Sequence, residues 1–301
     1  MRHNLDSICL LRDECCASLS KIKSSDSLEF QPLTMASAYC DFITKHPISQ
    51  REKLVSFEQN IDSTFGDEIR ILFYQYLIYH LYIDGISIID NQDLPSSIIP
   101  LLEEDFSRIV NFAQQENKKL LSIKNQAFLS YIEKLLFRAY PIGNQDVSIS
   151  GIPRSIVFRQ GLLKGFRCFQ LLYQSGGNYP FFEMHYNPHR LRYFNQQGWN
   201  DLLFRATELL AKQTHINGIF GSAWFFDKTL ADISPEIFYI YQTLEKIGGE
   251  FFFFKSSEDD QKNAFLTSKA RREAYNEGRY IPASYMVILP RDVLLSHYDL
   301  D

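Results

Sequence analysis

Apolar residues recur at helical spacing through the first half of the chain. Residues 67–83 are apolar on most faces, which predicts a buried central helix that ends at Asp84-Gly85. Ser49 stands three residues before Glu52, the pattern of a capping box that opens a helix. Residues 1–30 form a polar, partly helical lead-in. Further helices are expected over residues 35–45, 101–115 and 128–140.

The period changes after a cluster of turn-forming residues at 141–144. Two-residue alternation then predicts strands over residues 155–159, 166–173 and 181–186. Helices over 199–212, 234–247 and 267–276 alternate with strands over 216–226, 250–255 and 284–289. We therefore expect a mainly helical N-terminal domain, residues 1–145, and an α/β (α+β) domain, residues 146–301, in which helices flank a mixed β-sheet.

Aromatic residues are unusually frequent, with 25 Phe and 17 Tyr among 301 residues. They fit either a Phe-rich core, which carries more weight, or a pocket for an apolar ligand. The apolar content of 45% is enough for a globular core. A net charge of −5 argues against a general nucleic-acid-binding protein, which needs a basic face.

The five cysteines show no Cys-x-x-Cys spacing, and Cys15 and Cys16 are adjacent. This pattern is typical of free thiols in a reducing compartment. Neither a signal-peptide pattern nor an apolar run of about 18 residues, long enough to span a membrane, occurs. We therefore expect a cytoplasmic protein.

The best candidate site is the segment of residues 181–201, where a short apolar strand gives way to an amphipathic helix. The intervening loop carries His185, His189, Arg190 and Arg192. A strand that leads into a helix N-terminus is a frequent anion site, because unpaired N–H groups and the helix dipole point there.

Four motifs in residues 150–295 resemble the C-terminal domain of GNAT-like N-acyltransferases. The first is a strand ending in histidine, Phe182-Glu183-Met184-His185. The second, Ser222-Ala223-Trp224-Phe225-Phe226-Asp227-Lys228-Thr229-Leu230, is similar to the family's Ser-Trp-Leu-Leu-Asp-Pro-x-Leu strand end. Ile233-Ser234-Pro235-Glu236 then opens a helix, and Thr267-Ser268-x-x-Arg271-Arg272-x-x-Tyr275-x-x-Gly278 precedes the closing strand. A helical region before such a domain also fits the family.

The resemblance implies acyl transfer from a thioester, on acyl-CoA or an acyl-carrier protein, to an amine of a small molecule or peptide. No permanently bound cofactor is expected. One departure concerns the loop that holds the pyrophosphate of coenzyme A, which in the family reads Arg/Gln-x-x-Gly-x-Gly/Ala. The corresponding loop, residues 187–198, has only Gly198, and Arg190 and Arg192 supply side-chain charge instead. Three alternatives follow. The protein binds the donor in a different way, the donor is an acyl group on a carrier protein, or the protein transfers no acyl group.

Transfer to an amine needs a base, donors that polarise the thioester carbonyl, and a group that receives the thiolate. His185 is the candidate base, because its reference pKa lies near neutral pH, although a structural histidine fits equally. Glu183 shares its strand face and could orient the ring or act as base, or be a solvated residue. Arg190 and Arg192 have the geometry for phosphate, but surface arginines in loops are common.

The later motifs supply further candidates. Arg271 and Arg272 are a second anion candidate, against the more ordinary reading of a solvated helix face. Ser222 and Trp224 could line an acyl cleft, with core packing the competing role for Trp224. Tyr275 could protonate the thiolate, although single tyrosines are weak evidence. Tyr285 is a further candidate of the same kind.

A metal centre is a weaker interpretation. Glu183, His185 and His189 offer three ligands, but Pro188 makes their spacing irregular, so we expect no metal. No Gly-x-Ser-x-Gly motif indicates a nucleophilic serine. The sequence therefore favours an N-acyltransferase, and the main alternative is a non-catalytic protein that holds a ligand in the same cleft.

Overall fold

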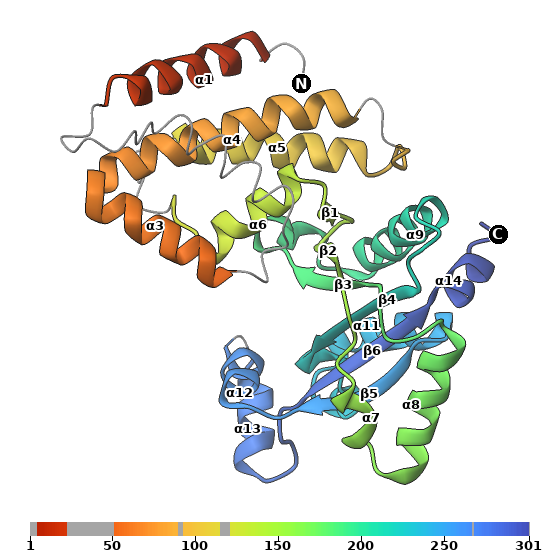
Figure 1. Ribbon diagram of the computed structural model, residues 1–301. Coiled ribbons are helices and arrows are strands. Elements are labelled where there is room, and N and C mark those ends of the chain that lie inside the picture. The colour runs from red at the N-terminus through yellow and green to blue at the C-terminus, as the bar shows by residue number, and fades with distance from the viewer. Residues whose placement is uncertain (1–4, 23–50, 90–92, 115–120, 267, 301) are drawn as a thin grey trace. The chain divides into compact units, whose positions relative to one another are not determined.

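The computed structural model describes residues 5–22, 51–89, 93–114, 121–266 and 268–300. The chain divides into two compact units, Met1–Tyr140 and Pro141–Asp301 (Figure 1). The sequence pattern places a domain boundary five residues later, after residue 145. The expected helix over 35–45 and the cap at Ser49 lie outside the described residues.

The first unit is built around α4, Asp67–Ile89. Four helices pack on it: α1 (Leu5–Ser20), α3 (Arg51–Phe65), α5 (Ile99–Gln114) and α6 (Gln126–Leu135). The prediction of a buried central helix is confirmed, but its expected end at Asp84-Gly85 is wrong. Gly85 lies inside the helix, where a Cβ would stand 3.1 Å from the Phe106 ring. Glycine therefore permits close packing of α5 here and does not end the helix.

The second unit contains β2 to β6 of a six-stranded sheet whose order is β1-β2-β3-β4-β6-β5, and β1 crosses the division between Tyr140 and Pro141. β3 and β4 run parallel, whereas β2–β3, β4–β6 and β6–β5 are antiparallel. The strands are β1 (Ala139–Pro141), β2 (Gln145–Ser150), β3 (Phe181–Tyr186), β4 (Gly218–Ala223), β5 (Glu250–Lys255) and β6 (Ser284–Pro290).

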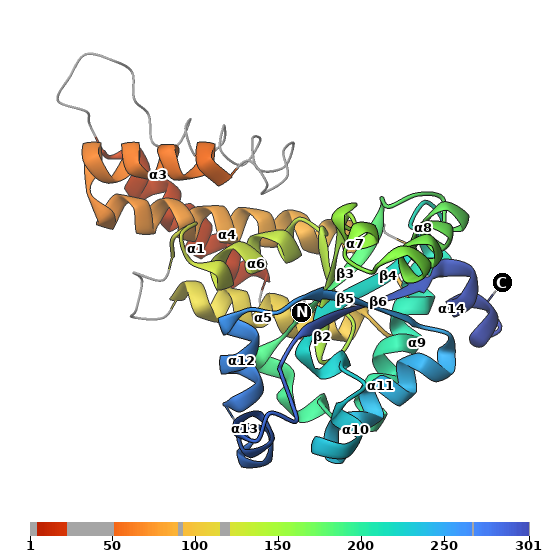
Figure 2. The same ribbon diagram turned by 90° about the horizontal axis from the view of Figure 1, so that it is seen from below.

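Helices cover both faces of this sheet (Figure 2). On one face α7 (Ser155–Phe158) and α8 (Leu162–Gln174) contribute Ile156, Cys168 and Leu172 to a core that includes Phe181 and Phe220 of the strands. α9 (Gln196–Lys212) and α11 (Pro235–Ile247) cover the other face. The expected fold class, a mixed sheet flanked by helices and preceded by a helical region, is confirmed.

Two predicted strands are wrong. Residues 155–159 and 166–173 fall in α7 and α8, whose buried positions Gly165, Cys168 and Leu172 recur at helical spacing. The pattern predicted a strand at residues 166–173 because apolar residues on the exposed face of α8 hide its helical periodicity. The C-terminal end of the predicted strand over 216–226 is a 3₁₀ turn, η5 (Trp224–Phe226). The other predicted strands and helices of this unit correspond to β3, α9, α11, β5, α13 (Lys269–Asn276) and β6.

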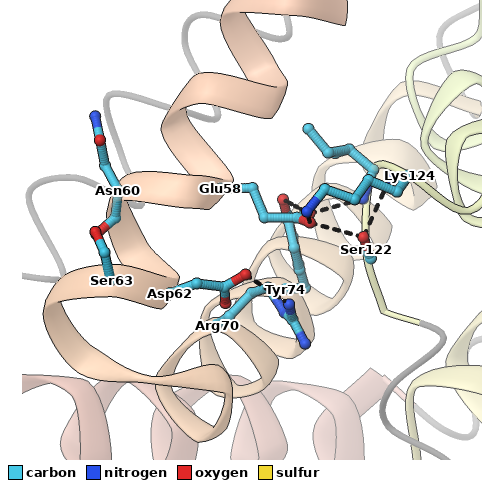
Figure 3. A network of polar contacts seen from close by, with 9 residues as sticks. Glu58, Asn60, Asp62, Ser63, Arg70, Tyr74, Ser122 and Lys124 are labelled. Atoms are coloured by element: carbon cyan, nitrogen blue, oxygen red, sulfur yellow. Dashed lines mark hydrogen bonds and ion pairs between the residues drawn. The ribbon is translucent and has the colours of Figure 1, made fainter.

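A buried carboxylate joins α3 to the segment before α6 (Figure 3). Glu58 is fully buried and accepts hydrogen bonds from Tyr74 Oη at 2.8 Å, Ser122 Oγ at 2.8 Å and the Ile123 amide at 2.9 Å. Lys124 Nζ lies 3.6 Å from the same carboxylate. These bonds satisfy the oxygens of a carboxyl group that would otherwise be costly to bury.

Replacing Glu58 by Ala should lower the free energy of unfolding by about 3 kcal/mol or more, because two hydroxyls and one amide lose their acceptor in the interior. Urea unfolding followed by far-UV circular dichroism measures this loss. Ser63→Ala is the matched control on the same helix, since Ser63 is exposed and donates back to the Asn60 carbonyl of its own helix at 3.1 Å. Equal stability of the two variants would contradict a structural role for the network.

Candidate functional site

The sheet of the second unit is held together at its centre by a short parallel seam. β3 and β4 are in register only at Phe182–Ile219 and Glu183–Phe220. In contrast, β2–β3 and β4–β6 each pair over six residues. The two halves of the sheet therefore separate beyond Glu183 and Phe220, and the backbone groups at the carboxyl ends of β3 and β4 do not pair with each other.

A cavity of about 590 Å³ opens where the two strands part. Met184 and Tyr186 of β3 and Gly221, Ser222 and Ala223 of β4 form part of its wall. The close approach of Met184 favours glycine at position 221, since a Cβ there would stand 2.8 Å from Met184 Cε. The remaining lining residues are Gln145, Leu191, Phe194, Trp199, Trp224, Phe225, Phe226, Ile237, Asn263, Arg271 and Ser284.

Aromatic rings make up much of the cavity wall. Phe225 is central: its ring centroid lies 5.7 Å from Phe194, 6.2 Å from Trp199, 5.5 Å from Trp224 and 4.9 Å from Phe226, all edge to face. This geometry is favourable for aromatic pairs and fixes the wall. Trp199 is fully buried, and its Nε1–H has no hydrogen-bond partner among the described residues.

Arg271 is the one charged side chain among the described residues that line this cavity. It is buried, lies 4.6 Å above the Trp224 ring, donates to Ser234 Oγ at 2.9 Å and to the Ala264 carbonyl at 2.5 Å. Burial lowers the pKa of Arg271, an effect that nearby Glu236 opposes. The guanidinium still keeps its charge at neutral pH, because its reference value is so high.

Three of the residues proposed from the sequence meet in this cavity: Ser222, Trp224 and Arg271. Arg272 and Tyr275, also on α13, do not line it among the described residues. Both side chains are exposed, and the Tyr275 ring lies 5.1 Å from Phe265. Any role for them in the chemistry stays a prediction.

His185 and Glu183 lie on the other face of β3. Alternation along the strand places them with Phe181, which packs toward α8, whereas Met184 and Tyr186 face the cavity. His185 is exposed, and its Nε2 lies 2.8 Å from Ser148 Oγ of β2. The histidine is thus held by a hydrogen bond one residue away from the cavity wall.

The loop after β3 is a 3₁₀ segment, η4 (Pro188–Tyr193). Arg190 is fully buried in it, whereas Arg192 is exposed and its guanidinium lies 4.8 Å over the Tyr193 ring. A shared phosphate site would need the two arginines side by side and exposed. The structure instead buries Arg190 and exposes Arg192. Their predicted contact with a donor stays a proposal.

Gly198 has a packing reason to be glycine. A Cβ would stand 1.8 Å from the Tyr193 carbonyl oxygen, and the Gly198 amide already donates to the capping Asn195 Oδ1 at 2.9 Å. The amide that would face an anion at this helix N-terminus is therefore satisfied by the protein itself. Its predicted contact with a cofactor is untested.

Sequence reasoning missed the aromatic side chains that line the cavity beside Trp224, namely Phe194, Trp199, Phe225 and Phe226. The run Trp224-Phe225-Phe226 directly after β4 could have indicated an aromatic wall, but the predicted strand over 216–226 included these three residues. Of the described residues, no group of three or more His, Cys, Asp or Glu side chains could hold a metal ion. Within the described ranges no helix is long and apolar enough to cross a membrane.

No protein-family model matches the sequence, and no curated protein does. Among solved structures, the fold is similar to an acyltransferase in complex with decanoyl-CoA, at 12% identity and a TM-score of 0.44, over 72% of this chain and 65% of that one. An acyltransferase in complex with decanoyl-CoA and teicoplanin matches at 12% identity and a TM-score of 0.41, over 72% of this chain and 66% of that one. The chain thus spans slightly less than two thirds of the length of these proteins.

Replacing Gly198 by Ala should destabilise the second unit by about 3 kcal/mol or more, because the new methyl group meets a backbone carbonyl that cannot move alone. Thermal unfolding followed by the fluorescence of the neighbouring Trp199 measures the effect. Gly278→Ala is the control, since Gly278 has a positive φ of 72° but nothing within 4 Å, and should cost only about 1 kcal/mol. A Gly198 variant as stable as this control would contradict the packing explanation.

Asp227 follows the aromatic run and is buried, with Oδ1 accepting from the Thr229 amide at 2.9 Å. Burial raises the pKa of Asp227, and the bonds from Thr229 partly oppose this. A raised pKa means that the folded protein binds the proton more tightly than the unfolded one. The protonated side chain therefore favours the fold below the unfolded pKa, and this stability is lost as pH rises through the folded pKa.

Asp227→Asn should accordingly raise the melting temperature at neutral pH, since the amide removes the buried charge and keeps the acceptor for Thr229. The gain should shrink toward zero as pH falls below the ordinary aspartate pKa of about 3.9. Thermal melts across this pH range test it, with exposed Asp232→Asn as control. A gain that persists unchanged in acid would contradict the assignment.

Proposed function

We propose that this protein is an N-acyltransferase of the GNAT-like type, which moves an acyl group from acyl-CoA or an acyl-carrier protein to an amine of a small molecule or peptide. The observation that carries the proposal is the separation of parallel strands β3 and β4 above an aromatic cavity. The motifs from the sequence support it, because Ser222 and Trp224 lie in the wall of that cavity.

The separated strands suit the arm of a thioester donor. Backbone N–H and C=O groups need partners, and the amides of a pantetheine arm can supply them to strand ends that do not pair with each other. The cavity volume lies within the range of about 300–1,000 Å³ typical of small-molecule sites. The acyl chain would enter among Phe194, Phe225 and Trp199, and the Trp199 Nε1–H is a buried donor that an acceptor oxygen of the ligand would satisfy.

In this proposal the thioester carbonyl lies in the gap between the ends of β3 and β4, and the amine approaches it from the strand face opposite the cavity. There His185 takes the proton from the acceptor amine, and Ser148 holds the imidazole through the 2.8 Å contact. The amine nitrogen attacks the thioester carbonyl carbon, the C–N bond forms, and the C–S bond breaks as the tetrahedral intermediate collapses. The proton from the amine goes to the departing thiolate through the base. Ser222 is the proposed hydroxyl donor to the carbonyl oxygen. It borders the cavity at the end of β4, and alternation from Phe220, which pairs with Glu183, places its side chain on the same sheet face as His185.

A second function is favoured by one observation, the packing role of Gly198. The loop after β3 uses its glycine against the Tyr193 carbonyl, and its helix N-terminus is capped by Asn195. A protein that holds an apolar ligand in the cavity without transferring it needs no pyrophosphate loop. The two functions differ in one measurable property, which is the appearance of an acylated amine.

Acyl-CoAs of increasing chain length should raise the melting temperature progressively, while free CoA raises it least, because the chain adds apolar burial in the cavity. A thermal-shift series measures this. Ala223→Leu should weaken binding of the long-chain donors about tenfold, since its side chain extends into the cavity. Exposed Ala270→Leu, which lies outside the lining, is the matched control.

Transfer itself is measured by free-thiol release and by mass spectrometry of a panel of amines. His185→Ala should lower the rate by about 10²–10⁴-fold without changing the thermal shift from the donor, whereas exposed His189→Ala should leave both unchanged. A shift with no acylated amine would favour the binding protein. No shift with any acyl-CoA would remove CoA as the donor, and acyl-carrier-protein thioesters would then be tested in the same assay.

A further inference from the structure

A second apolar surface lies on the outside of α7 and α8, away from the cavity. Six large side chains there are between 56% and 95% exposed: Phe158, Leu162, Leu163, Phe166, Phe169 and Tyr173. Single exposed apolar residues are ordinary, but a contiguous group of this size marks an interaction site. We call these six residues the α8 ridge.

Four of the six residues of the α8 ridge form a stripe along α8. Leu162, Phe166, Phe169 and Tyr173 recur at intervals of three and four residues and so share one side of α8. The Phe169 and Tyr173 rings stack with centroids 6.4 Å apart. A separate side of α8 packs into the core through Cys168 and Leu172, so the exposed stripe is not needed to attach the helix to the sheet.

The charged residues near the ridge in the sequence are all basic. Residues 147–182 contain Arg154, Arg159, Lys164 and Arg167 and no Asp or Glu, although the chain as a whole carries a net charge of −5. All four basic side chains are exposed. Arg167 pairs with Glu250 of β5 at 2.7 Å, which leaves the other three to set the sign of the surface.

We propose that the α8 ridge binds the surface of an anionic lipid bilayer. A helix with Phe and Leu on its outer side and Lys and Arg beside them can lie in the interface, with its apolar side chains among the acyl chains and its cations at the headgroups. None of the ridge residues lines the aromatic cavity or the pocket bordered by Phe204 and Tyr298. Exposed side chains along a helix suit a deformable lipid surface better than a protein partner, which would need a matching groove.

A second copy of the chain is the less favourable occupant. A two-fold interface brings the same patch of each copy together, so Arg154, Arg159 and Lys164 of both copies would meet across it. Like charges brought together at a desolvated interface oppose association. A lipid surface with anionic headgroups instead attracts the same cations.

The experiment is co-sedimentation of the full chain with vesicles of phosphatidylcholine alone or mixed one to one with phosphatidylglycerol. We expect binding to the mixed vesicles that weakens with added salt, and little binding to the neutral ones. Phe166→Gln with Phe169→Gln should reduce the partition coefficient about tenfold for each side chain. Arg154→Gln with Lys164→Gln should reduce it about fivefold for each charge.

Ile281→Gln is the matched control, since Ile281 is 67% exposed in the same unit but outside the ridge. Because all substituted side chains are exposed, melting temperatures should stay at the wild-type value. Equal sedimentation with neutral and anionic vesicles would overturn the assignment to an anionic surface. So would vesicle binding that the ridge variants leave unchanged, or a dimer in analytical ultracentrifugation that the Phe166 and Phe169 variants convert to monomer.

Discussion

The parallel seam between β3 and β4 is the constraint on which the second unit depends. Two registered residue pairs, Phe182–Ile219 and Glu183–Phe220, join halves that are each paired internally over longer strands. Because the seam is short, the strands part before they end, and side chains must close the space that hydrogen bonds leave open. The cavity is therefore a consequence of the sheet's topology, in the place where ligands of open α/β sheets bind, at the carboxyl ends of parallel strands.

Side chains from distant parts of the chain keep that opening rigid. Phe225 makes edge-to-face contacts with Phe194, Trp199 and Trp224. Arg271 lies over Trp224 and ties α13 to Ser234 at the start of α11. A cavity with such a wall keeps its shape without a ligand, and this reduces the entropy that binding would cost.

The sequence predicted much of this unit, because β3, α9 and α11 each bury one clear apolar run or stripe and β5 is a continuous run of Phe. It also placed Glu183 and His185 on one strand face. It could not show that the cavity lies on the opposite face, because that depends on which strand pairs with β3 and where the pairing stops. Gly198 illustrates the same limit. Its position suggested an anion loop, whereas contact with the Tyr193 carbonyl, made by a tight turn, explains it without a ligand.

The wrong prediction at residues 166–173 and the α8 ridge have one physical origin. Sequence periodicity assumes that apolar residues mark the buried side, so a helix that is apolar on both sides loses its helical signal and resembles a strand. α8 has Cys168 and Leu172 in the core and Phe166 and Phe169 in solvent. Exposed Phe side chains contribute nothing to attaching the helix, and water contact makes them unfavourable in the isolated protein. Contact of these side chains with a bilayer, as proposed, would remove them from water, while the neighbouring basic residues would meet the anionic headgroups.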